Sequence, residues 1–152
     1  MRRLISSLAI IIFAYAPAFA QDKLLSAVGF ALTGRDDAYV KVIDRNDCIF
    51  QITSEFNNWQ NRETYYLNAV DPSRTTIAQV EKTMLYPFPH IEIDLYGEKT
   101  IYDQYSINPK YPTKTERKKF QRLTLPSNEL ERVIRAWKYV FSNGCHGTRS
   151  TF

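Results

Sequence analysis

The pair Cys145–His146, near the end of the chain, is the first arrangement that could do chemistry. A thiol beside a base can act as a nucleophile, but side chains adjacent in sequence rarely adopt the geometry this requires. The only other cysteine is Cys48. An even pair of cysteines in an oxidising compartment favours a disulfide. We therefore predict a Cys48–Cys145 cross-link rather than a reactive thiol, with His146 exposed.

A second arrangement lies in the segment HIEIDL, where alternation places His90, Glu92 and Asp94 on one face of a strand. Three such ligands could hold zinc or another divalent ion and support a metal-dependent hydrolase. The same alternation is typical of the solvated face of an antiparallel strand. We favour the solvated face, expect no cofactor, and keep the metal site as the alternative.

A basic stretch runs from residue 109 to residue 122 and contains six basic residues and one acid. We interpret it as a surface loop that leads into a short strand. The loop could also contact anionic lipid or polysaccharide, whereas export argues against nucleic acid. The candidate anion-binding residues are Lys110, Lys114, Arg117, Lys118, Lys119 and Arg122.

Aromatic residues offer a further candidate surface, because a ligand groove and a protein-binding face both favour amphipathic rings. Packing in the core is the commoner cause of such a pattern, and Trp137 is expected there. The candidates are Trp59, Tyr65, Tyr66, Tyr102 and Tyr105. The sequence has no nucleophile elbow, phosphate-binding loop or glycosidase-like carboxylate pair, so it favours a protein that is not an enzyme.

The first twenty residues have the pattern of an export signal. Two arginines precede an apolar stretch, and Ala18-Phe19-Ala20 is a cleavage pattern that places the mature start at Gln21. Pro17 disfavours a retained membrane anchor. The whole chain has 20 basic and 16 acidic residues, and the leader removes two arginines, which leaves a net charge of +2. We expect one periplasmic or secreted domain over residues 21–152, with no transmembrane segment.

Hydrophobic periodicity and turn residues predict the elements that position these groups. Residues 54–63 read as a loop or a helical turn. The last helix is amphipathic, with Trp137 within its apolar stripe. The expected elements are a helix at 23–33, a hairpin at 38–53, strands at 64–70 and 75–86, a hairpin formed by 90–95 and 100–107, a strand at 120–125, and a helix from 127 to 142.

These elements predict an α+β domain with one curled antiparallel sheet of about six strands and a C-terminal helix packed on its concave face. Strands followed by one closing helix resemble a pleckstrin-homology-type roll. In this arrangement Cys48 points inward from a strand and Cys145 emerges near the buried side of the helix. The cross-link would therefore tie the last helix to the sheet.

The segments DRNDCIF, TYYLNAVD and RAWKYVFSNGC resemble small exported proteins of Gram-negative bacteria. The resemblance spans most of the mature chain and includes both cysteines. It implies export and the disulfide, and it implies no activity, ligand or catalytic residue.

Three hypotheses of function follow. The first is a non-catalytic periplasmic module that binds another protein or an anionic envelope surface through its aromatic face or basic loop. The second is a metal-dependent hydrolase built on the HIEIDL strand. The third is an inhibitor of another secreted enzyme, which needs an exposed rigid loop such as 54–63.

Overall fold

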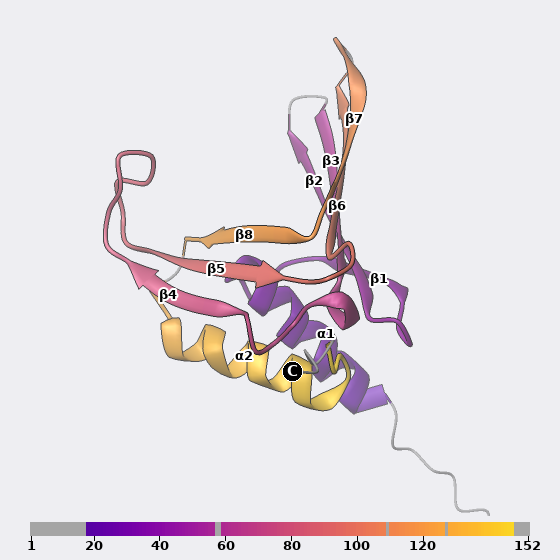
Figure 1. Ribbon diagram of the computed structural model, residues 1–152, viewed down its shortest axis with the longest axis vertical. Coiled ribbons are helices and arrows are strands. Elements are labelled where there is room, and N and C mark those ends of the chain that lie inside the picture. Colours follow the sequence, from indigo (N-terminus) through magenta and orange to yellow (C-terminus); the bar gives the residue numbers. More distant parts are fainter. Residues whose placement is uncertain (1–17, 57–58, 109, 127, 148–152) are drawn as a thin grey trace, which may run out of the picture.

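The computed structural model describes residues 18–56, 59–108, 110–126 and 128–147 (Figure 1). Residues 1–17 of the predicted leader lie outside this range. The expected helix at 23–33 and the expected C-terminal helix are both confirmed. In chain order the described elements are α1 (Ala18–Thr33), β1 (Val40–Asp44), β2 (Ile49–Phe56), β3 (Trp59–Tyr66), a 3-10 helix (Leu67–Ala69), β4 (Thr76–Val80), β5 (His90–Tyr96), β6 (Tyr102–Asn108), β7 (Tyr111–Lys118), β8 (Phe120–Leu125) and α2 (Leu130–Asn143).

The strands form two antiparallel sheets, not the single six-stranded sheet that we expected. One has the order β1-β2-β3-β6-β7 and the other the order β4-β5-β8. The expected pairing of residues 90–95 with 100–107 is wrong, because β5 pairs with β4 and β8 while β6 pairs with β3 and β7. The segment between β5 and β6 is a turn, as its residues predict, but it carries the chain from one sheet to the other. The expected roll, a single sheet closed by one helix, is therefore wrong.

Strands β2, β3, β6 and β7 form an arm that projects beyond the rest of the molecule (Figure 1). The segment at 54–63, expected as a loop or a helical turn, and residues 111–118 of the expected basic loop supply strands to this arm. The β2–β3 pairing continues to Phe56↔Trp59, and β7 pairs with β6 from Tyr111 to Lys118. Away from the core neither face of a strand needs apolar residues, so hydrophobic alternation does not mark these strands. The exposed loop that the inhibitor hypothesis required is therefore largely strand.

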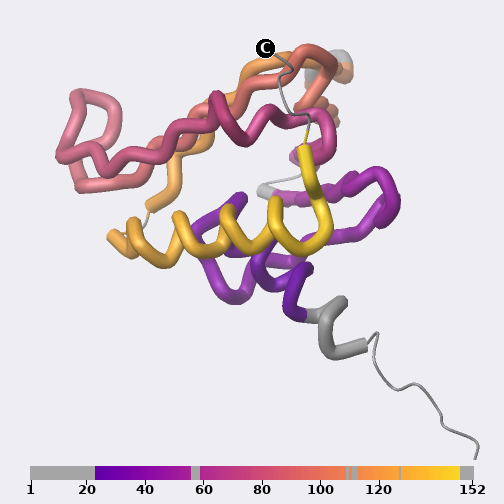
Figure 2. Tube along the Cα trace, turned by 60° about the horizontal axis from the view of Figure 1, so that its bottom comes forward, coloured from indigo at the N-terminus to yellow at the C-terminus, as the bar shows by residue number. Residues whose placement is uncertain are grey.

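The core lies between the three-stranded sheet and the two helices, which cover one face of that sheet (Figures 1 and 2). Ile91, Ile93 and Leu95 of β5 are buried on this face. Leu123 and Leu125 of β8 lie opposite Ile93 and Ile91 and are also buried. The alternation of HIEIDL is thus confirmed, with its isoleucines and leucine pointing into the core. Trp137 of α2 is buried as predicted.

The predicted disulfide joins Cys48 to Cys145, with 5.6 Å between the two Cα atoms. Cys48 lies in the β1–β2 turn rather than within a strand, and its φ of 52° places it in the left-handed region. Cys145 follows the end of α2, and its N–H donates to the Val140 carbonyl at 3.0 Å. Both cysteines are buried, while His146 is exposed as expected. The bond therefore ties the end of the last helix to the five-stranded sheet.

Candidate functional site

The carboxylates of β5 meet a basic residue on the neighbouring strand. Arg122 of β8 lies directly opposite Asp94. Its Nε and Nη2 donate to the two carboxylate oxygens of Asp94 at 2.6 and 2.7 Å, and its Nη1 lies 3.4 Å from Oε2 of Glu92. The hydrogen bond from Arg122 holds the pKa of Asp94 below its ordinary value. A bidentate pair of this kind fixes Asp94 and Arg122 on each other.

His90, by contrast, is buried at the start of β5, with only 2% of its surface exposed. Its Nδ1 lies 3.0 Å from the Phe88 carbonyl oxygen and its Nε2 lies 3.4 Å from Oε1 of Glu92. Its ring is 5.0 Å from that of Tyr86. Within the described ranges no group of three histidine, cysteine, aspartate or glutamate side chains is placed to hold a metal ion. His90 instead holds the loop that precedes its own strand.

The six basic candidates do not form one patch. Lys114 and Lys118 both contact Glu116 on one face of β7. Arg117 points to the opposite face, where its Nε lies 3.8 Å from Oδ2 of Asp103. Arg122 belongs to the other sheet, Lys110 is exposed between β6 and β7, and Lys119 is exposed at the crossing from β7 to β8. Because β7 is a strand and not a loop, its basic residues divide between two faces.

The lysines on either side of Glu116 lower the pKa of its carboxyl group to about 2. A depressed pKa in the folded state stabilises the fold above the ordinary value near 4.5, and this contribution is lost as the pH falls toward 2. We expect the double substitution Lys114→Gln/Lys118→Gln to return the pKa toward 4.5. An NMR titration of the Glu116 carboxyl carbon measures this directly. An unchanged pKa in the variant would show that the lysines are not the cause.

The inner face of the arm, defined by Asn61, Glu63, Tyr65, Tyr102 and Gln104, is a hydrogen-bonded network. The hydroxyls of Tyr65 and Tyr102 each donate to the Glu63 carboxylate at 3.2 Å. The Gln104 amide donates to Oδ1 of Asn61 at 3.0 Å. Burial raises the pKa of both tyrosines well above its ordinary value. Two of the aromatic candidates, Tyr65 and Tyr102, are therefore core residues whose polar ends are satisfied.

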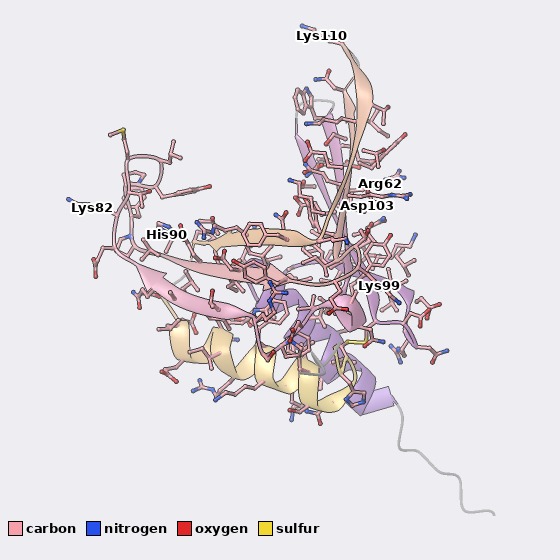
Figure 3. All side chains as sticks on the ribbon, in the orientation of Figure 1. Arg62, Lys82, His90, Lys99, Asp103 and Lys110 are labelled. Carbon is pink, nitrogen blue, oxygen red and sulfur yellow. A yellow bond between two sulfur atoms is a disulfide. The ribbon has the colours of Figure 1, made fainter. Side chains whose placement is uncertain are left out.

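The outer face of the arm is defined by Arg62, Tyr66, Asp103, Tyr105 and Arg117. Cross-strand pairing places Arg62 beside Tyr105 and Asp103 beside Arg117, and directly opposite residues share a face of the sheet. Arg62 and Asp103 lie on the same side of the arm as Lys99 (Figure 3). Tyr105 and both arginines are exposed. This face therefore combines cations with tyrosine rings.

A hollow of about 550 Å³ opens at the base of this outer face. Arg117 and Lys99 contribute positive charge to its lining, and Asp47 contributes one carboxylate. Its size lies within the usual range of small-ligand pockets, and a few polar groups among apolar walls are typical of such sites. The hollow is lined by Asp47, Ile49, Tyr66, Asn68, Ala69, Lys99, Thr100 and Arg117. Of these, only Tyr66 and Arg117 were candidates in the sequence.

The loop between β4 and β5, residues 81–89, is a surface that the sequence analysis missed. All of its residues are exposed, including Met84, Leu85, Tyr86 and Phe88. Residues 81–86 fall within the strand predicted at 75–86, a prediction that rests on the threonines of that segment and on its position after a turn, against a helical spacing of its apolar residues. A signal was available, since Pro87 and Pro89 disrupt strand pairing. Apolar residues beside two prolines could therefore have indicated an exposed loop. We call residues 81–89 the apolar loop.

The part of the chain that the structure describes contains no helix long and apolar enough to span a membrane. In the comparisons, the chain matches no protein-family model, no curated protein and no solved structure.

Proposed function

We propose that the chain is an exported, disulfide-stapled binding module that takes an anionic ligand on the outer face of its arm. The hollow that contains Lys99 and Arg117 is the observation that carries the proposal. Export is supported by the cleavage pattern that ends at Ala20. The Cys48–Cys145 bond accords with an oxidising compartment.

The chemistry of the hollow suits a small anionic group attached to a larger molecule. Lys99 and Arg117 can donate charge-assisted hydrogen bonds to a carboxylate, sulfate or phosphate. Tyr66 offers a ring for apolar or stacking contact. Beyond the hollow, Arg62 and Tyr105 continue the same combination along the arm. An anionic polysaccharide chain can occupy both parts of this surface.

Calorimetric titration with heparin, a sulfated polysaccharide, tests the proposal. We expect binding that weakens with salt. The variant Lys99→Gln/Arg117→Gln should lose at least about tenfold in affinity, because two charge-assisted contacts are removed. The matched control, Arg135→Gln/Lys138→Gln, removes the same charge from exposed positions of α2 and should bind as the wild type does.

Two outcomes oppose the proposal. Unchanged affinity in the Lys99→Gln/Arg117→Gln variant would mean that the hollow does not receive the anion. An equal loss in the α2 control would mean that heparin responds only to net charge. An amide NMR spectrum gives an independent readout, since the shifts caused by heparin should centre on Tyr66 and Thr100.

A further inference from the structure

The apolar loop lies at the end of the projecting β4–β5 hairpin (Figures 1 and 2), and its large apolar side chains are exposed to solvent. Relative exposure is 103% for Met84, 85% for Leu85 and 75% for Phe88. A cluster of large apolar side chains that gains nothing from the core is costly in water and indicates an interaction site. The loop joins β4 to β5 directly, since Val80 and His90 are paired.

The backbone of this loop suits a medium that offers few hydrogen bonds. Thr83 N–H donates to the Tyr86 carbonyl at 2.8 Å, and Tyr86 N–H donates to Oγ1 of Thr83 at 3.0 Å. Pro87 and Pro89 have no N–H at all. Several backbone donors are thus satisfied or missing, which lowers the cost of entering an apolar environment. No charged residue lies between Lys82 and His90.

His90 gives the loop a fixed base. Its buried ring contacts both the Tyr86 ring and the Phe88 carbonyl. The side of the ring facing Glu92 is tied to the sheet through the contact at 3.4 Å. His90, which the sequence suggested as a metal ligand, therefore positions the apolar loop. Rigid presentation of apolar side chains reduces the entropy lost on docking.

Shape and charge distinguish a lipid surface from a second copy of the chain. A stable interface between proteins buries roughly 800 Å² on each partner. Even if each of the four side chains is given the roughly 200 Å² of an aromatic residue, their exposed fractions leave only about 600 Å² to cover. A bilayer needs no complementary surface, and it accepts a narrow apolar tip. Lys82 at the loop and Lys110 on the arm lie on the side of the three-stranded sheet away from α2, where they can meet anionic headgroups (Figure 3). Glu81, which precedes Lys82 in the loop, is also exposed.

We propose that the apolar loop is a membrane-docking element that inserts Met84, Leu85 and Phe88 into the interface of an anionic lipid bilayer. Lys82 then lies at headgroup level, where its charge remains solvated. This surface is separate from the hollow of the arm. Docking through it neither requires nor excludes a ligand there.

Vesicle co-sedimentation of the disulfide-bonded chain, residues 21–152, tests the proposal. We expect binding to vesicles of phosphatidylethanolamine with phosphatidylglycerol, and weaker binding to phosphatidylcholine alone. The variant Met84→Ser/Leu85→Ser should partition at least about tenfold less, because two inserted side chains become polar. The control Tyr39→Ser/Ile43→Ser removes two exposed apolar side chains elsewhere and should bind as the wild type does.

A second readout reports insertion itself. In a Trp59→Tyr background, Met84→Trp should shift its fluorescence to shorter wavelength on the same vesicles and be quenched by brominated acyl chains. The absence of both effects would overturn the proposal. Equal vesicle binding by the Met84→Ser/Leu85→Ser variant would also overturn the proposal. So would sedimentation without lipid that shows a dimer for the wild type and a monomer for this variant, because the loop would then bind a second copy of the chain. The Lys99→Gln/Arg117→Gln variant should still bind the vesicles, which separates this test from that of the arm.

Discussion

Replacing both cysteines, as Cys48→Ala/Cys145→Ala, should lower the free energy of unfolding by about 4 kcal/mol. The bond closes a loop between positions separated by 97 residues. In the chain-entropy model a loop of this length restricts the unfolded state strongly. The loss is a large fraction of the stability of a domain this small. Urea unfolding monitored by circular dichroism measures it.

The wild type in reducing buffer provides the matched comparison. Reduction opens the same loop and keeps both side chains, so its midpoint should approach that of the double variant. A decrease below about 1 kcal/mol in both samples would contradict the role assigned to the bond. It would mean that α2 is held on the molecule by packing alone.

The substitution Gly97→Ala should destabilise the fold by about 2 to 3 kcal/mol, the upper part of the range for overpacking. A Cβ at this position would overlap the Ala69 carbonyl oxygen and the Ile101 side chain. Gly97 lies where the chain leaves the three-stranded sheet, and its N–H donates to the Lys119 carbonyl at 2.9 Å. The backbone cannot move away without breaking this hydrogen bond, which joins the two segments that pass between the sheets.

Gly29→Ala is the matched control, because Gly29 lies within α1. A Cβ there would be 3.3 Å from Cγ2 of Val40, a contact that a small shift relieves. Alanine also favours the helix by about 1 kcal/mol. We expect thermal unfolding at or slightly above the wild-type temperature for Gly29→Ala and clearly below it for Gly97→Ala. Equal melting temperatures for the two variants would show that the backbone at Gly97 has room for a Cβ atom.

The parts of the fold that the sequence predicts are those with one buried face. Ile91, Ile93 and Leu95 alternate with polar residues because β5 lies on the core, and the apolar stripe of α2 contains Trp137 for the same reason. The disulfide follows from there being only two cysteines in a chain with an export pattern. The strand and the helix follow from local periodicity, and the disulfide follows from the number of cysteines. None of these predictions depends on how the strands are connected.

The arm and the pairing of strands could not be predicted in the same way. Residues 113–118 of β7 are polar on both faces of their strand, so their composition favours a loop. The turn after Tyr96 has the residues of a hairpin, yet β5 and β6 pair elsewhere because the chain changes sheets there. His90 alternates with Glu92 and Asp94 but is buried by contacts with its own preceding loop. Lys99 joins Arg117 only through this tertiary arrangement.

The central claim is that the chain is exported and then locked by one sulfur–sulfur bond between its last helix and its five-stranded sheet. The most direct test is the intact mass of the chain, produced with residues 1–20 in a Gram-negative host and isolated from the periplasm without reductant. The account predicts a protein that begins at Gln21 and lacks the two thiol hydrogens of Cys48 and Cys145. A mass that retains the leader, or that shows two free thiols, would contradict it.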